Sequence, residues 1–205
     1  MVDVFFAKLS TFASIVDLAK YLSPQEQEKL AQINSDFGKK KFAVGRYLIR
    51  SQLAKLLGCA ANEVELEITK NGRIELKDRS LSFNLSHSKD VAILAISNQR
   101  QVGIDVELIR KKDFLLIAKN FFKANELEIL KNAKNEDEQA KLFYYFWTAK
   151  EAVVKCEGGS IFDRKNQPQF DFDFSKQKII SHLEQFHLEF FTPQPSYIAA
   201  LAWKK

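Results

Sequence analysis

The same order of elements occurs twice along the 205-residue chain, and this repeat restricts the folds open to it. Apolar residues at helical spacing predict two long helices, over 37–57 and 136–155. Each helix is followed by an alternation of apolar and acidic residues typical of a strand, VELEI at 64–68 and FDFDF at 170–174. These two segments begin 106 positions apart.

Each half then ends in a short apolar run, VAILAI at 91–96 and IAALAW at 198–203. We therefore expect an α+β fold with a pseudo-twofold arrangement of two similar α/β halves, residues 1–100 and 101–205. A cleft between such halves is a natural ligand site.

Composition narrows the class of protein. No stretch reaches the roughly 18 to 20 apolar residues of a membrane span, and the N-terminus lacks a signal-peptide pattern, so we expect a cytoplasmic protein without a membrane partner. Cys59 and Cys156 stand apart, which argues against a disulfide framework or a zinc site. The formal net charge of +5 indicates attraction to an anion, either nucleic acid, a phosphorylated small molecule or an acidic protein.

The segment VGIDVE, at 102–107, places two carboxylates on one face of a predicted strand. Asp105 and Glu107 alternate with Ile104 and Val106, which point the other way. Oxygen ligands of this kind suit a hard cation such as Mg²⁺. The alternative is a half-exposed strand whose acidic residues face water.

The segment FWTAKEAVVK, at 146–155, places Glu151 and Lys155 on one stripe of a predicted helix. The two side chains could form an ordinary surface ion pair. They could also supply a third carboxylate to a metal site and a cation for a phosphate group.

The segment SFNLSHS, at 82–88, carries Asn84, Ser86 and His87 in a loop or strand-end setting before an apolar strand. Hydrogen-bonding groups in this setting could recognise a phosphate. A structural role for the histidine is the alternative.

Taken together, FNLSHS, GIDVE and FWTAKEAVVK, with Phe121 and Phe122 between the second and third, resemble the Sfp-type family of 4′-phosphopantetheinyl transferases, the double-length class. The resemblance implies a two-half fold that binds coenzyme A and Mg²⁺, with Mn²⁺ as a substitute, in the cleft between the halves. It implies that Asp105, Glu107 and Glu151 coordinate the metal.

The resemblance also assigns residues to coenzyme A. Ser86 and His87 match the pair that contacts the 3′-phosphate, and Asn84 belongs to the same motif. Lys29 matches a phosphate-contacting lysine, whereas Glu26 stands where the family has a basic residue. The remaining predicted contacts are Lys41, where the family more often has arginine, Arg73 within NGRI, where the family has lysine, the metal ligand Asp105, and Lys155.

The implied reaction is attack by a carrier-protein serine on the β-phosphorus of coenzyme A, with adenosine 3′,5′-bisphosphate leaving. Lys155 is expected to stabilise the departing phosphate, and either Glu151 or Glu126 to take the serine proton. The implied partner is an acidic acyl or peptidyl carrier protein, and we expect a monomer. A nucleic-acid-binding module is the rival suggested by charge, but the sequence contains no RNA-binding signature, zinc finger or long basic run.

Overall fold

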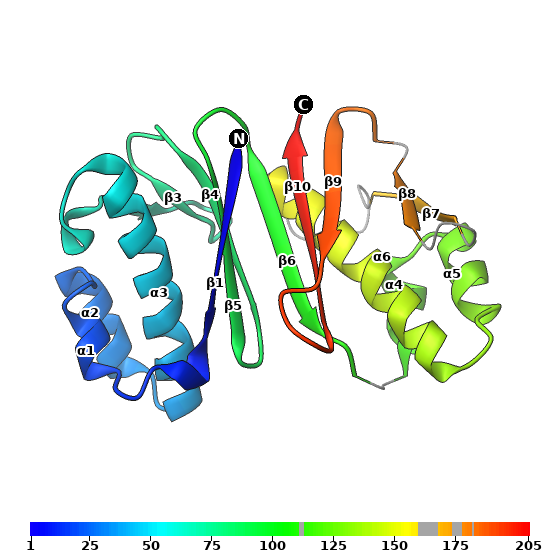
Figure 1. Cartoon of the computed structure of the whole chain (residues 1–205), viewed down its shortest axis with the longest axis horizontal. Helices are drawn as coiled ribbons and strands as arrows, with labels where there is room; N and C mark the ends of the chain where they lie inside the picture. The colour runs from blue at the N-terminus through cyan, green and yellow to red at the C-terminus, as the bar shows by residue number, and fades with distance from the viewer. Residues whose placement is uncertain (111–112, 160–167, 174–177, 182) are drawn as a thin grey trace. The chain divides into compact units, whose positions relative to one another are not determined.

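The computed structural model describes residues 1–110, 113–159, 168–173, 178–181 and 183–205. The chain forms two compact units, Met1–Asn98 and Gln99–Lys205, called here the N-terminal unit and the C-terminal unit (Figure 1). Both contain helices and antiparallel sheets, which confirms the expected α+β class. In the ranges given above, no helix is both long enough and apolar enough to cross a membrane.

The N-terminal unit is built on a three-stranded antiparallel sheet with the order β1-β5-β4 and a separate β2-β3 hairpin. Its strands are β1 (Val2–Lys8), β2 (Leu66–Ile68), β3 (Ile74–Leu76), β4 (Ser82–Ser88) and β5 (Val91–Ser97). Its helical elements are η1 (Leu9–Thr11), α1 (Val16–Ala19), α2 (Pro24–Gln32), α3 (Asp36–Leu57) and η2 (Ala61–Glu63).

Helix α3 covers the sheet of this unit (Figure 1). It begins after Ser35, whose hydroxyl accepts a hydrogen bond from the Gly38 N–H, and it ends at Gly58 in the left-handed conformation. Its apolar face, including Val44 and Leu48, is buried together with Leu94 of β5. This packing forms the core of the N-terminal unit.

The C-terminal unit has a three-stranded antiparallel sheet with the order β6-β10-β9 and a separate β7-β8 hairpin. Its strands are β6 (Val102–Leu108), β7 (Phe170–Asp173), β8 (Lys178–Ser181), β9 (Phe186–Phe191) and β10 (Tyr197–Lys204). Its helices are α4 (Phe114–Phe121), α5 (Ala124–Lys131) and α6 (Glu136–Cys156).

Helix α6 is the counterpart of α3 and packs on β6 and β10 (Figure 1). Asn135 caps its first turn by accepting a hydrogen bond from the Glu138 N–H. The predicted apolar face, with Phe146, Ala149 and Val153, is fully buried. The helix is therefore anchored along its length to the sheet of its own unit.

Both sheets have the same strand order. In each, the last strand of the unit is central, the first strand pairs with one side of it and the penultimate strand with the other. The two predicted long helices are confirmed as α3 and α6, and the apolar runs as β5 and β10. The first alternating segment forms a shorter strand than expected, because β2 begins only at Leu66. The second segment forms β7 over Phe170–Asp173, and position 174 lies outside the described residues.

Candidate active-site residues

A close approach of α6 to β6 sets the geometry of the carboxylate site. A Cβ atom at Gly103 would lie 2.1 Å from the Ala152 carbonyl oxygen and 2.3 Å from the Cys156 nitrogen, so only glycine fits there. Across the sheet, Gly103 pairs with Ala202 and Asp105 with Ala200. These small side chains allow the helix backbone to lie directly on the strands, next to Asp105.

Lys155 connects Asp105 to Glu151 within the C-terminal unit. Its Nζ lies 2.6 Å from Asp105 Oδ1 and 3.7 Å from Glu151 Oε2. Asp105 is 4% exposed, so it does not lie on a water-facing side of the strand, the alternative that the sequence left open. The predicted metal carboxylates Asp105 and Glu151 thus meet at one ammonium group.

The local charges shift two pKa values. Burial, with repulsion from Asp105 and Glu107, raises the pKa of Glu151 to about 7, although attraction to Lys155 opposes the shift. Burial would lower the pKa of Lys155, but attraction to Asp105 and Glu151 outweighs it and raises that pKa above its ordinary value. The cluster therefore has an excess of negative charge.

The donor set agrees in kind with a magnesium ion. Asp105, Glu107 and Glu151 offer only carboxylate oxygens, which Mg²⁺ prefers, and their mutual repulsion would be relieved by a cation. In the part of the chain that the structure describes, however, no three His, Cys, Asp or Glu side chains are arranged around a common metal position. Two of the three carboxylates instead approach the Lys155 ammonium.

Glu126, the second candidate base, lies in a different environment. Its side chain is 0% exposed, and its Oε2 lies 2.8 Å from the Nζ of Lys150, which is equally buried. The same carboxylate accepts hydrogen bonds from the N–H groups of Lys123, at 2.7 Å, and Phe170, at 2.9 Å. Lys150 also donates to the Pro168 carbonyl oxygen. Glu126 thus joins α5, α6 and β7.

The SFNLSHS segment forms strand β4, and Ser86 and His87 lie at its end, which is one of the two settings that the sequence predicted. Adjacent strand residues point to opposite faces, so Ser86 and His87 cannot both face the same side of the sheet. Ser86 is buried, whereas His87 is exposed and lines a hollow with Lys41. Asn84 lies on the same face as Ser86 and is half-buried.

Lys29 and Arg73 occupy two further places in the N-terminal unit. Lys29, in the last turn of α2, lies with its Nζ 5.8 Å from the centre of the Phe42 ring. Arg73 follows the turn at Gly72 between β2 and β3 and lies 3.3 Å from Glu75, with a hydrogen bond to the Phe83 carbonyl oxygen. Lys41 and His87 therefore line the same hollow, whereas Arg73 is not among its lining residues.

Sequence reasoning gave no role to Lys150 or to the basic pair Arg46 and Arg50. A lysine within the apolar stripe of α6, four residues after Phe146, was the signal for a buried charge. Two signals indicated a cluster of Arg46, Arg50 and Glu26. The two arginines are four residues apart on α3, and Glu26 belongs to the Ser-Pro-Gln-Glu capping pattern that begins α2.

Comparison with known proteins gives the class. Residues 101–202 match the family described as the 4′-phosphopantetheinyl transferase superfamily. Residues 10–99 match the family described as 4′-phosphopantetheinyl transferase, N-terminal. The chain belongs to the 4′-phosphopantetheinyl transferase superfamily, as its sequence motifs suggested.

Individual relatives agree with this family. The chain is 36% identical to the 4′-phosphopantetheinyl transferase HetI of Nostoc sp., over 73% of this chain and 65% of the relative. It is 32% identical to the 4′-phosphopantetheinyl transferase Sfp of Bacillus subtilis, over 67% and 61% respectively. It is 31% identical to the human L-aminoadipate-semialdehyde dehydrogenase-phosphopantetheinyl transferase, over 73% and 52%. The matches therefore span less than two thirds of each of these relatives.

Proposed function

We propose that the chain transfers the 4′-phosphopantetheine group of coenzyme A to a serine of an acyl or peptidyl carrier protein and releases adenosine 3′,5′-bisphosphate. The observation that carries this proposal is the contact of Lys155 with Asp105 and Glu151 in a chain of this family. It combines metal-binding oxygens with a cation suited to phosphate. Relatives whose names state the same activity support the proposal.

Asp105, Glu107 and Glu151 are the residues that would hold Mg²⁺, or Mn²⁺ in its place. When bound, the ion supplies positive charge to the pyrophosphate oxygens of coenzyme A. The donor chemistry and the excess negative charge of the cluster support this assignment.

Lys155 is the residue proposed to contact the departing phosphate. Its raised pKa keeps the ammonium group charged, so it can offset charge on the oxygen from which the phosphorus separates. Because 27% of its side chain is exposed, the group is accessible to a ligand. Lys155 would exchange contact with Asp105 for contact with the substrate.

Glu151 is the base that the environment favours over Glu126. The Glu151 side chain is 17% exposed and lies beside Lys155, the residue proposed to contact the departing phosphate, so a carrier serine could reach it. It would take the serine proton, directly or through water, as the serine oxygen bonds to the β-phosphorus and the bond to the nucleotide breaks. Glu126 is fully buried and bound to Lys150, which supports a structural role instead.

The two units divide these tasks in the proposal. Residues 1–100 would supply the coenzyme A nucleotide contacts, with Lys29, Lys41, Arg73, Asn84, Ser86 and His87 as candidates. Residues 101–205 would supply the metal and catalytic residues. The common strand order supports an origin by duplication and a pseudo-twofold relation between the halves. We further propose a cytoplasmic monomer that acts on an acidic carrier.

Mass spectrometry tests the proposed activity directly. Several apo acyl and peptidyl carrier proteins are incubated with the protein, coenzyme A and Mg²⁺. A carrier should gain the mass of one phosphopantetheine group, a chelator should prevent the gain, and Mg²⁺ or Mn²⁺ should restore it. Coenzyme A binding without modification of any carrier would overturn transfer as the function.

A further inference from the structure

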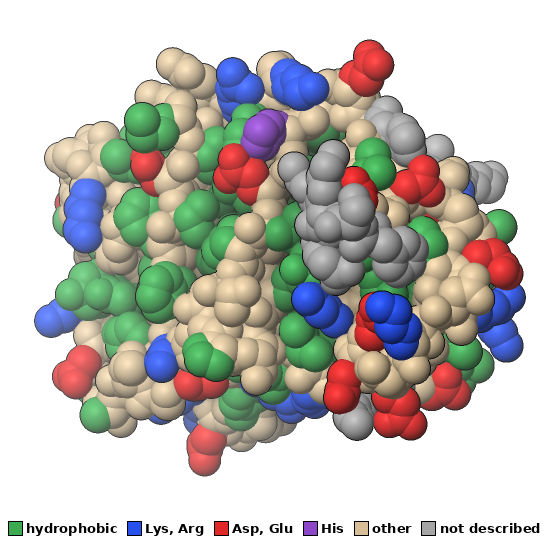
Figure 2. All heavy atoms as spheres, turned by 45° about the vertical axis from the view of Figure 1, so that its right-hand side comes forward, with side chains coloured by type: hydrophobic (Ala, Val, Ile, Leu, Met, Phe, Trp, Pro, Cys, Tyr) green, Lys and Arg blue, Asp and Glu red, His purple; other side chains and the backbone are tan. Residues whose placement is uncertain are grey.

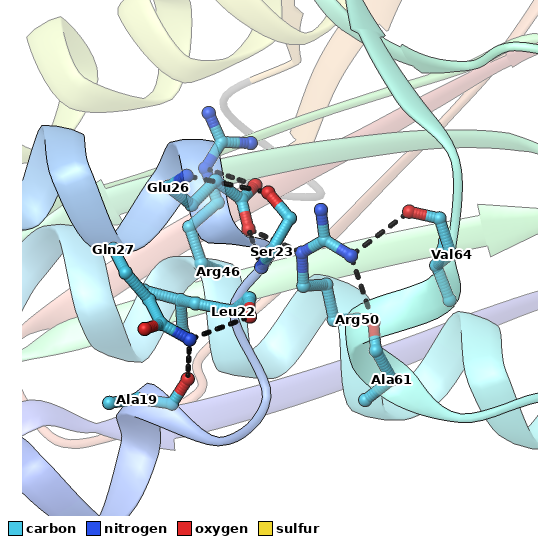
Figure 3. A network of polar contacts seen from close by, with 9 residues as sticks. All are labelled: Ala19, Leu22, Ser23, Glu26, Gln27, Arg46, Arg50, Ala61 and Val64. Carbon is cyan, nitrogen blue, oxygen red and sulfur yellow. Dashed lines mark hydrogen bonds and ion pairs between the residues drawn. The ribbon is translucent and has the colours of Figure 1, made fainter.

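The N-terminal unit contains a buried cluster of one carboxylate and two guanidinium groups (Figure 3). Glu26 stands at the third position of α2, where it completes a capping box with Ser23. Its Oε1 lies 3.2 Å from Arg46 Nε, and its Oε2 pairs with Arg50 Nε. One negative charge is therefore shared by two cations, which leaves the cluster with a net positive charge.

The two arginines differ in their hydrogen bonds to the rest of the unit. Arg50 donates from Nη1 to the carbonyl oxygens of Ala61 and Val64, both at 2.9 Å, so it connects α3 to the following segment. Arg46 is held through Nε alone, and its buried Nη1 has no hydrogen-bond partner among the described residues. Its side chain is 9% exposed.

Such an arrangement is costly unless a ligand completes it. A buried donor without an acceptor costs about 1–3 kcal/mol, more when it belongs to a charged group. Burial, reinforced by repulsion from Arg50, lowers the pKa of Arg46, whereas Glu26 opposes the shift. An anion beside Arg46 would both accept the hydrogen bond and relieve this repulsion.

Arg46 and Ile74 line two hollows of the N-terminal unit. The first, of about 530 Å³, contains the carboxylates Glu26, Glu63 and Glu65 together with Lys29. The second, of about 320 Å³, has no carboxylate in its lining. The lining of this second hollow includes Ile33, Lys41, Phe42, Arg46, Leu85 and His87.

The wall of the second hollow is almost wholly apolar, and cationic side chains lie beside Phe42, one of its lining residues. The Arg46 guanidinium lies 5.3 Å from the centre of the Phe42 ring, and the Lys29 ammonium lies 5.8 Å from it. Lys41 and His87 belong to the same lining. The apolar wall fits a flat, weakly polar group, and the cations beside Phe42 fit a phosphate monoester attached to that group, as at the nucleotide end of coenzyme A.

We propose that Arg46 donates from Nη1 to the 3′-phosphate of coenzyme A and that Glu26 is the positioning residue that holds its guanidinium through Nε. The inference rests on the proposed function, because it takes coenzyme A as the substrate. It makes Glu26, an acidic residue, part of a phosphate site: the carboxylate fixes the orientation of the guanidinium through Nε, and Nη1 has no acceptor among the described residues.

Calorimetric titration with coenzyme A and with 3′-dephospho-coenzyme A tests the contact. The Arg46→Gln variant should bind coenzyme A about tenfold or more weakly, and the dephospho ligand about as tightly as the unaltered protein does. Arg46→Lys, which keeps the charge but not Nη1, should lose part of this preference. Lys55→Gln, which removes an exposed cation from the same helix, should change neither affinity.

The role of Glu26 is tested by the ratio of the affinities for coenzyme A and for 3′-dephospho-coenzyme A. A loss of stability alone would not change this ratio. Glu26→Gln should reduce the preference for coenzyme A over the dephospho ligand, and adding Arg46→Gln to it should reduce the preference little further. An unchanged preference in Arg46→Gln, or in Arg46→Lys if the first variant does not fold, overturns the inference. Failure of the unaltered protein to bind coenzyme A at all would instead overturn the proposed function.

Discussion

Lys155 Nζ lies 2.6 Å from Asp105 Oδ1 and 3.7 Å from Glu151 Oε2, so one ammonium group joins a strand carboxylate to a carboxylate of its own helix. Glu107 adds to the negative field at Glu151. Three carboxylates with one lysine leave an excess of negative charge, which a divalent cation would offset.

Replacement of Asp105 by asparagine should abolish most transfer while the fold persists. The change preserves size but removes the charge that pairs with Lys155 and that would bind the metal. We expect kcat to fall about 100-fold or more at ordinary Mg²⁺ concentrations, measured with a saturating apo carrier. Glu128→Gln, which removes an exposed carboxylate paired with Lys131, is the matched control. Near-normal turnover by folded Asp105→Asn would remove Asp105 from the metal site.

The two candidate bases should give different results when each is changed to glutamine. Glu151→Gln should lose turnover with little change in stability, because it removes a carboxylate proposed both to bind the metal and to accept the serine proton. Glu126→Gln should lower the free energy of unfolding by about 3–5 kcal/mol, because Lys150 then remains as an unpaired buried charge. Urea unfolding and kcat per folded molecule separate these effects. The reverse pattern would make Glu126 the base.

Much of this organisation could be predicted from the sequence, because it depends on periodicity. The helical spacing predicted α3 and α6 almost to their ends, and the apolar runs predicted β5 and β10. The repeat at 106 to 107 positions corresponds to two units with one strand order. The stripe that carries Glu151 and Lys155 also lies where the spacing placed it.

What the sequence did not predict depends on contacts between distant segments. The charge pair of Glu126 and Lys150 joins residues 24 positions apart, and Glu26 meets Arg50 at the same separation. Alternation along β4 also places Ser86 and His87 on opposite faces of the strand, although the sequence motif groups them as a pair. Local spacing can indicate a buried charge, but it does not identify the distant residue that pairs with it. It separates Ser86 from His87 only once the segment is known to be a strand.

Gly103→Ala should damage both the fold and the carboxylate site. The new Cβ would lie 2.1 Å from the Ala152 carbonyl oxygen, a backbone atom of α6 that cannot move without the helix. We expect a loss of at least about 1–3 kcal/mol in the free energy of unfolding and a lower kcat, because Lys155 moves away from Asp105. Gly45→Ala is the control: its Cβ would meet only the Leu85 side chain, at 3.1 Å, and alanine favours the helix. Equal stability of both variants would contradict the close approach.

His87→Ala should weaken coenzyme A much more than 3′-dephospho-coenzyme A. His87 is exposed in the hollow that Lys41 and Arg46 also line, and a lost phosphate contact matters only when the phosphate is present. A charge-assisted hydrogen bond predicts a difference of about 1.5–3 kcal/mol between the two ligands, measured by calorimetry. Equal weakening of both would show that His87 has a structural role.

The encounter with an acidic carrier should be steered by charge and should therefore depend on salt. The chain carries a net charge of +5, although on the face in Figure 2 basic and acidic side chains are interspersed. At physiological ionic strength the Debye length is about 8 Å, so attraction between exposed charges weakens while buried contacts change less. The expected result is a KM for the carrier that rises with salt at nearly constant kcat. Coenzyme A is also anionic, so it must stay saturating while the carrier is varied. A kcat/KM for an acidic carrier that does not change with salt would show that apolar contacts, not net charge, hold the partner.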